Sequence, residues 1–203
     1  MVERMVAHPA ALPVGPIGRY GLGQWGVGAL IASEAALFGY LLFAYYYDGA
    51  TAHVGWLLEP RPALWPALPN TILLLASSGV AWIAEKGVER GHRPQALWGL
   101  AGTIVMGAIF AAVQIGEWAA KPYRPGTSNY ASLYFTTTGL HMAHVLAGLV
   151  ILGVLAWWVA LDYFTPRRRI VVSTGILYWH FVDVVWLFVF STYYLTPYLG
   201  FGR

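Results

Sequence analysis

The sequence contains no cysteine and few charged residues, and each absence excludes a class of protein. Without cysteine there is no disulfide, no thiolate metal site and no cysteine nucleophile. Asp, Glu, Lys and Arg make up 10% of the 203 residues, whereas a soluble domain has about 25%. Hydrophobic residues make up 58%. Such a chain cannot cover its surface with groups that suit water, so we expect an integral membrane protein.

Motifs for nucleotide chemistry are missing too. The sequence has no P-loop, no dinucleotide fingerprint and no recognisable catalytic triad. The net charge of +3 comes from basic residues in the segments between apolar runs. This distribution indicates membrane topology, and we expect no nucleic-acid partner.

Five apolar runs approach or exceed the length of about 20 residues that a membrane span requires. Each must be helical, because lipid offers no partner for free backbone groups. The second run opens on "LPNT", where Pro69 favours a helix start and Asn70 or Thr71 can cap it. We therefore predict an all-α bundle of five transmembrane helices in residues 25–203, after an N-terminal cytoplasmic tail at 1–24. The expected spans are 25–46, 68–86, 96–119, 131–160 and 172–195.

The basic residues between these spans predict the orientation. If the N-terminus is cytoplasmic, the inside segments hold eight of the twelve Lys and Arg residues, including the "RRR" run at 167–169. The outside segments hold the other four. Because positive charge gathers on the cytoplasmic side, we expect the N-terminus in the cytoplasm and the C-terminus outside.

A few ionisable residues fall inside the spans, where they need explanation. Glu34 and Asp183 lie deep, and a carboxylate at the bilayer centre costs about 2.5 to 3.5 kcal/mol. No Lys or Arg lies equally deep, so these carboxyls must be protonated, paired with histidine, or satisfied by water or a partner chain. The full set of candidate site residues is Glu34, Glu117, His141, His144, His180 and Asp183.

The pattern around Asp183 favours a structural role. Trp179, Asp183 and Trp186 share a helix face, so that face packs on a neighbour and an indole N–H can donate to the carboxylate. His180 and Asp183 also share a face, which predicts a hydrogen-bonded cluster. His141 and His144 could ligate a metal or, with His180, a haem. Because a two-histidine spacing alone is weak evidence, we favour histidines bonded to carbonyls, carboxylates or lipid.

Glu34 lies on the first span, and two interpretations of its role are open. It is either a protonated carboxyl that bonds a neighbouring helix, or a group engaged in proton movement or partner contact. Small residues form a stripe on another side of the span, which predicts a close helix contact there. Glu34 would then face a different neighbour, which another subunit could supply. The stripe consists of Gly28, Ala32, Ala36 and Gly39.

Five motifs in order resemble subunit III of the haem-copper oxidases, and the resemblance runs through all five spans. The most specific is "YWHFVDVVWLF" at 178–188, and "TGLHMAHVLAG" at 138–148 is similar to the family's paired-histidine helix. The others are "SEAALF" at 33–38, "NTILLLASS" at 70–78 and "QIGEW" at 114–118. The family's larger form has seven helices, and a chain with five resembles the bacterial form.

The resemblance implies a non-redox accessory subunit of a cytochrome c oxidase in a bacterial cytoplasmic membrane. Glu34 stands at the family's carbodiimide-reactive carboxyl, and the other candidate residues stand at its buried polar positions. No catalytic or metal-binding residue is then expected in this chain, because the haems and copper belong to subunits I and II. The implied partners are those subunits, membrane lipids that include bound phospholipid, and an electron donor reached through the complex.

Several alternatives stay open at this point. The complex could be a quinol oxidase, or the chain could accompany a nitric oxide reductase. A proton-coupled transporter would need a substrate cavity and usually internal repeats, and no repeat is evident. A pure lipid or assembly scaffold and a haem-binding membrane protein are the remaining rivals.

Overall fold

The computed structural model describes residues 22–52, 55–57, 62–166 and 169–202, which form helices and their connections and contain no β-strand. Five helices are long and apolar enough to cross a membrane. The predicted all-α bundle of five spans is therefore confirmed. The first four predicted spans lie inside α-helices, and the fifth also includes the π-helix that follows the last α-helix. The helices are α1 (Leu22–Thr51), α2 (Leu64–Glu89), α3 (Arg93–Ala120), α4 (Asn129–Ala160) and α5 (Ile170–Phe190), which a short π-helix, η1 (Ser191–Leu195), extends.

Residues 1–21 of the predicted tail lie outside the described residues, and residues 22–24 belong to α1. The connections 53–54, 58–61 and 167–168 and residue 203 also lie outside them. The cytoplasmic location of the N-terminus stays a prediction.

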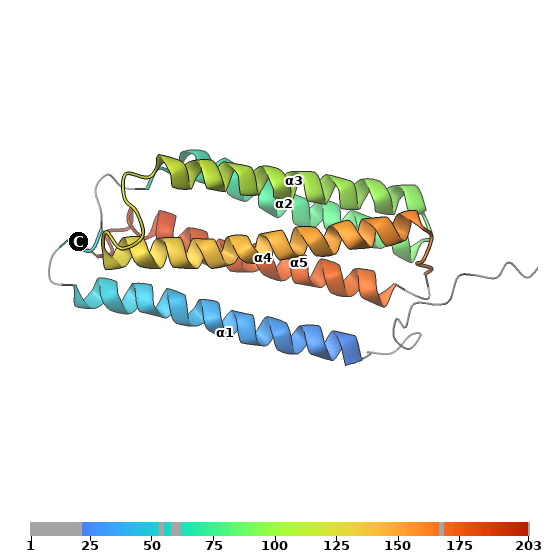
Figure 1. Cartoon of the computed structure of the whole chain (residues 1–203), viewed down its shortest axis with the longest axis horizontal. Coiled ribbons are helices and arrows are strands. Elements are labelled where there is room, and N and C mark those ends of the chain that lie inside the picture. The colour runs from blue at the N-terminus through green and yellow to red at the C-terminus, as the bar shows by residue number, and fades with distance from the viewer. Residues whose placement is uncertain (1–21, 53–54, 58–61, 167–168, 203) are drawn as a thin grey trace, which may run out of the picture.

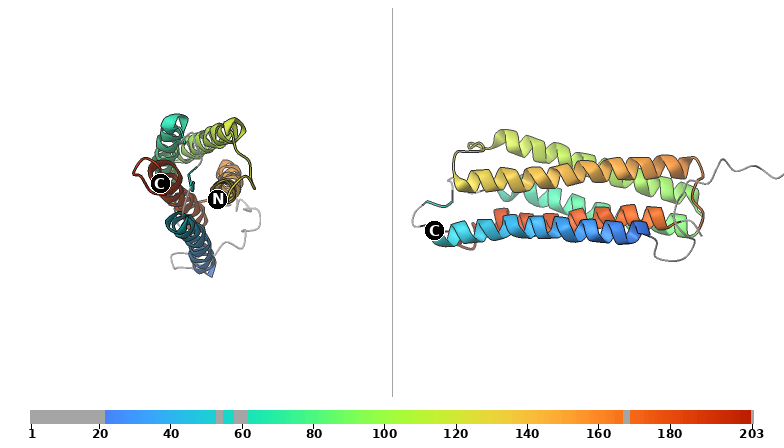
Figure 2. Two further views of the ribbon diagram at one scale, coloured as in Figure 1. Left: turned by 90° about the vertical axis from the view of Figure 1, so that its left-hand side faces the viewer. Right: turned by 60° about the horizontal axis from the view of Figure 1, so that its bottom comes forward.

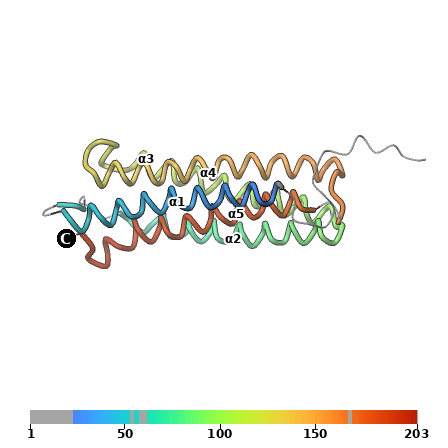
Figure 3. Tube along the Cα trace, turned by 90° about the horizontal axis from the view of Figure 1, so that it is seen from below, coloured from blue at the N-terminus to red at the C-terminus, as the bar shows by residue number. Residues whose placement is uncertain are grey.

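The helices lie side by side, and successive helices run in opposite directions (Figure 1). α2 and α3 form a hairpin, α4 packs on α3 and α5, and α5 also packs on α2. α1 packs on α4 and α5 and lies at the edge of the bundle (Figure 2). Seen from the side of α1, α5 lies behind it, with α4 and α2 on either side (Figure 3). α5 is therefore the helix around which the bundle is organised.

The two ends of the bundle differ in chemistry. We call the end with the α2–α3 and α4–α5 connections the basic end, because Arg90, Arg93 and the "RRR" run at 167–169 fall there in the sequence. The opposite end carries the α3–α4 connection and the residues after α5. We call it the tyrosine end, because buried tyrosines such as Tyr45, Tyr130, Tyr134 and Tyr193 gather there.

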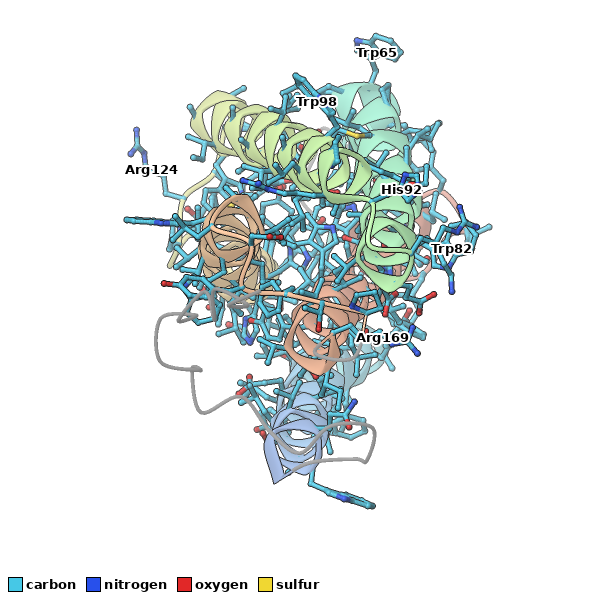
Figure 4. The ribbon with its side chains drawn as sticks, turned by 90° about the vertical axis from the view of Figure 1, so that its right-hand side faces the viewer. Trp65, Trp82, His92, Trp98, Arg124 and Arg169 are labelled. Carbon is cyan, nitrogen blue, oxygen red and sulfur yellow. The ribbon has the colours of Figure 1, made fainter. Side chains whose placement is uncertain are left out.

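The surface of the bundle is apolar, as a lipid-facing surface requires. Trp98 is 80% exposed and Trp157 is 69% exposed, whereas Trp179 and Trp186 of α5 are fully buried. Figure 4, seen from the basic end, shows Trp65 and Trp98 pointing away from the bundle. Large aromatic side chains thus occur both inside and outside, since lipid and core are equally apolar surroundings.

The start of α2 differs from the prediction. The helix begins at Leu64, with Trp65 in a non-helical conformation, so Pro69 lies inside it. Asn70 does not cap the helix, because its Nδ2 donates to the carbonyl of Phe110 on α3 at 3.1 Å. Thr71 donates to the carbonyl of Ala67 at 2.8 Å and does not cap either. The cap prediction was wrong because both side chains are used in packing within the bundle.

The small-residue stripe of α1 does not make the predicted contact within this chain. Its four members, Gly28, Ala32, Ala36 and Gly39, are all exposed. A Cβ atom added at Gly28 or Gly39 would meet no atom within 4 Å. α1 instead turns Phe38 and Tyr45, 3% and 0% exposed, toward the bundle. Those bulky aromatic side chains determine the inward face, and the stripe faces outward.

Candidate functional site

A hydrogen-bonded cluster joins α2 to α5 in the middle of the bundle. Ser78 of α2 donates to Oδ2 of Asp183, and its Oγ also lies 2.8 Å from Nδ1 of His180. Asp183 is 2% exposed. The predicted cluster of His180 and Asp183 is thus present, but the two side chains meet through Ser78, which the prediction did not name.

The tryptophans beside this cluster bond to other hydroxyl groups of α2. Nε1 of Trp179 donates to Oγ of Ser77 at 3.0 Å, and Nε1 of Trp186 donates to Oγ1 of Thr71 at 3.0 Å. The expected indole bond to Asp183 is therefore not formed. The packed face of Trp179, Asp183 and Trp186 is present, since all three are buried.

Glu34 contacts α4 of its own chain. Its Oε2 lies 3.1 Å from Nε2 of His144, and Nδ1 of His144 lies 2.8 Å from the carbonyl of Leu140. The side chains are 24% and 13% exposed, so the pair lies at the margin of the bundle. The rings of Phe38 and His144 pack in a T-shaped arrangement at a centroid distance of 5.2 Å. The neighbour that Glu34 faces is thus in this chain, and the outward stripe lies on another side of α1.

The three histidines of the spans have three different partners. His141 is 1% exposed, and its Nε2 lies 3.2 Å from the carbonyl of Val182 on α5. Its ring packs against those of Phe110 and Trp186. Within the part of the chain that the structure describes, no three His, Cys, Asp or Glu side chains are grouped as a metal site would require. The arrangement joins helices and does not converge on one point.

A third cluster lies at the tyrosine end. Oε1 of Glu117 accepts from the Tyr194 hydroxyl at 2.7 Å and lies 2.9 Å from Nζ of Lys121. The Lys121 ammonium also lies 5.1 Å from the ring centre of Tyr134 and 5.5 Å from that of Tyr194. The Glu117 and Lys121 side chains are only 7% and 9% exposed. The sequence analysis missed this ion pair, although an i, i+4 spacing of Glu and Lys could have found it.

Burial at this end also affects the loop that follows α3. It raises the pKa of Tyr123 to about 12, and the nearby Glu117 carboxylate acts in the same direction. The ring of Tyr123 packs against those of Tyr130 and Tyr134 at centroid distances of 6.1 Å each. The side chain of Tyr123 thus packs the loop between α3 and α4 against the bundle.

Comparison with known proteins identifies the family. The family model described as "Cytochrome c oxidase subunit III" matches residues 17–198, which include all five helices. The chain belongs to the cytochrome c oxidase subunit III family.

Individual relatives in this family agree. The chain is similar to proteins named "Cytochrome c oxidase subunit 3" from Neurospora crassa (33% identical over 177 residues) and Emericella nidulans (34% over 182). Each alignment covers 83% of this chain and 66% of the relative. A Danio rerio protein of the same name is 33% identical over 186 residues, 84% of this chain and 68% of the relative. The chain therefore spans about two thirds of the length of these subunit III proteins.

The three clusters contain five of the six candidate residues. The sixth, His141, bonds separately to the carbonyl of Val182 on α5. Each cluster connects residues of different helices or of a helix and the following loop. Chemically, these contacts can keep the helices in register and can hold a proton between two paired groups. The described hydroxyl that lies beside a histidine, Ser78 Oγ at 2.8 Å from His180 Nδ1, is bonded at the same time to Asp183.

Proposed function

We propose that the chain is a non-redox accessory subunit of a respiratory cytochrome c oxidase. In this proposal it stabilises the catalytic subunit and supports proton uptake while oxygen is reduced to water. The observation that carries the proposal is the subunit III family match across residues 17–198. The haems and copper would belong to subunits I and II, and no catalytic centre is assigned to this chain.

The geometry supports an accessory role in two ways. The candidate ionisable side chains inside the bundle bond to one another, to hydroxyl groups or to backbone, as in the pairs Glu34–His144 and Glu117–Lys121. The exposed face of α1 is apolar and carries small residues that allow another helix to approach closely. A rigid bundle with such a face is suited to pack against another membrane subunit or lipid.

Partners and location follow from the same proposal. We expect contacts with subunits I and II and with membrane phospholipid, and electron delivery from cytochrome c through the complex. The multi-pass bundle has five membrane-spanning helices. Its location in a bacterial cytoplasmic membrane stays a prediction, and the relatives named above come from two fungi and a fish.

Purification with native partners tests the proposal directly. The chain is tagged at its C-terminus, membranes are solubilised in mild detergent, and the purified material is examined by reduced-minus-oxidised spectroscopy and oxygen uptake. We expect haem bands and oxygen uptake driven by reduced cytochrome c. The control is a tagged, unrelated membrane protein carried through the same purification.

Other outcomes separate the alternatives. Uptake with quinol and not with cytochrome c would select a quinol oxidase, and nitric oxide consumption without oxygen uptake would select a nitric oxide reductase. A single colourless chain, from membranes with active oxidase, would overturn the accessory role. It would also return the transporter hypothesis to consideration.

A further inference from the structure

A groove opens between α1 and α2 in the half of the bundle nearer the basic end. Its volume is about 570 Å³, and α5 also contributes to its lining. Although the lining is largely apolar, polar side chains from all three helices reach it. These are Gln24 of α1, Glu85 of α2, and Ser173, Thr174 and His180 of α5.

The polar residues of the groove continue into the bundle along two helix faces. Glu85 and Ser78 are seven residues apart on α2, which places them two turns apart on one side. His180 and Asp183 are one turn apart on α5. Because α2 and α5 pack together, the two pairs face each other. The order from the groove inward is Glu85, His180, Ser78 and Asp183.

The inner three residues form a continuous hydrogen-bonded chain. Ser78 has one hydroxyl proton and donates it to Oδ2 of Asp183. The 2.8 Å contact between Ser78 Oγ and His180 Nδ1 must then use a proton on Nδ1. If Asp183 is protonated instead, its carboxyl donates to Ser78 Oγ, and the Ser78 hydroxyl donates to Nδ1 of His180. Either direction leaves each of the three groups bonded.

We propose that buried Asp183 exchanges protons with the groove through Ser78 and His180. A proton from the groove binds Nε2 of His180, Nδ1 passes its proton to Ser78 Oγ, and Ser78 passes its own proton to Asp183. His180 is then neutral with its proton on Nε2, and Asp183 is a neutral acid. Release follows the reverse path. Glu85 at the groove is the carboxylate that delivers and accepts protons at the entrance.

The titratable side chains described on the other helices packed against α5 bond elsewhere and not to Asp183. His141 of α4 bonds to the carbonyl of Val182 and not to the carboxyl. Glu34 of α1 bonds to His144 of α4. Oδ1 of Asp183 is buried and, among the described residues, has no hydrogen-bond partner. Among the described residues, the chain of hydrogen bonds therefore ends at Asp183.

Infrared spectroscopy of the purified protein with its native partners tests the exchange. The difference between wild type and Asp183→Asn isolates the Asp183 carboxyl bands, which are followed after exchange from H₂O into D₂O and after pH steps. We expect an Asp183-dependent change within seconds in wild type. Ser78→Ala should slow it by about tenfold or more, the effect of a barrier raised by about 1.4 kcal/mol. Ser78→Thr, which restores a hydroxyl, should restore the rate.

The adjacent serine supplies a matched control. Ser77 accepts from Trp179 and takes no part in the chain, so Ser77→Ala should exchange like wild type. His180→Gln provides a second interruption if Ser78→Ala does not accumulate. Equal rates in wild type and both interrupted variants would overturn the proposal, as would equal slowing by Ser77→Ala. The absence of any Asp183-dependent change in D₂O and across the pH steps would overturn it too.

Discussion

At the scale of single residues, the hydrogen bonds of His144 indicate where the protons lie in the contact between α1 and α4. Its Nδ1 lies 2.8 Å from the Leu140 carbonyl, an acceptor, so Nδ1 must carry a proton. Its Nε2 faces Oε2 of Glu34 at 3.1 Å. One further proton must sit between these two atoms, either on the imidazole or on the carboxyl. The pair is neutral overall in both arrangements, which suits its depth in the membrane.

This proton count predicts how substitutions at Glu34 will behave. In Glu34→Gln the amide N–H donates to Nε2 of a neutral His144, so the contact is kept. Glu34→Ala leaves His144 without that partner and should cost about 1 to 3 kcal/mol. We expect a lower thermal midpoint of the purified complex and faster loss of activity during turnover for Ala, with Gln close to wild type. Identical behaviour of the two variants would contradict the pairing.

Sequence reasoning identified the buried polar residues but not most of their partners. Glu34, His144 and Asp183 stand out because ionisable groups are rare in apolar spans. Ser78 does not stand out, because a hydroxyl costs little in a helix and occurs throughout such sequences. Which hydroxyl meets Asp183 depends on the rotation and register of α2 against α5. The Glu117–Lys121 pair could have been predicted from the sequence, because the two residues are one helical turn apart.

At the scale of helices, the α2–α3 hairpin depends on glycine at its closest approach. A Cβ atom added at Gly99 would lie 2.8 Å from Cα of Ala84, and one added at Gly87 would lie 2.6 Å from the backbone nitrogen of Ala96. Both neighbours are backbone atoms, which cannot move aside without moving a helix. The small residues let the two backbones pack closely, as they do at many membrane helix contacts.

Two glycines of α3 allow a matched comparison. Gly99→Ala should push α2 and α3 apart and cost about 1 to 3 kcal/mol, as overpacking does. Gly116→Ala meets no atom within 4 Å and should be neutral or stabilise by about 0.5 to 1 kcal/mol, since alanine favours helix. The thermal midpoint of the purified protein measures both. A Gly99→Ala variant as stable as Gly116→Ala would show that the approach of α2 to α3 is looser than described.

The inward face of α1 illustrates what a helix sequence leaves open. α1 is apolar on nearly all sides, so hydropathy alone does not distinguish its core side from its lipid side. The stripe of Gly28, Ala32, Ala36 and Gly39 suggested a contact, but Phe38 and Tyr45 make the contact instead. In a membrane, a large apolar side chain is equally well surrounded by lipid and by protein. The shape of the packing therefore determines which face of the helix points into the bundle. The number and position of the helices were predictable because length and hydropathy determine them.

At the scale of the whole molecule, the charges at the two ends remain the strongest indication of orientation. The basic end carries an interhelical ion network in which Glu89 of α2 pairs with Lys86 and with Arg169 at the start of α5. At the tyrosine end, Lys121 is instead buried against Glu117. Because the two connections at the basic end carry more Lys and Arg residues than the α3–α4 connection, the positive-inside tendency predicts that the basic end is cytoplasmic.

Single cysteines can test this orientation without background, because the chain has none of its own. His92 is exposed at the basic end, and Arg124 is exposed at the tyrosine end and projects from the bundle (Figure 4). In sealed membranes with the outer face accessible, an impermeant maleimide should label Arg124→Cys at once. His92→Cys should react only after permeabilisation, and the cysteine-free parent should not react at all. Labelling of His92→Cys in sealed membranes, with Arg124→Cys protected, would reverse the topology and place the groove and its path to Asp183 on the outer side.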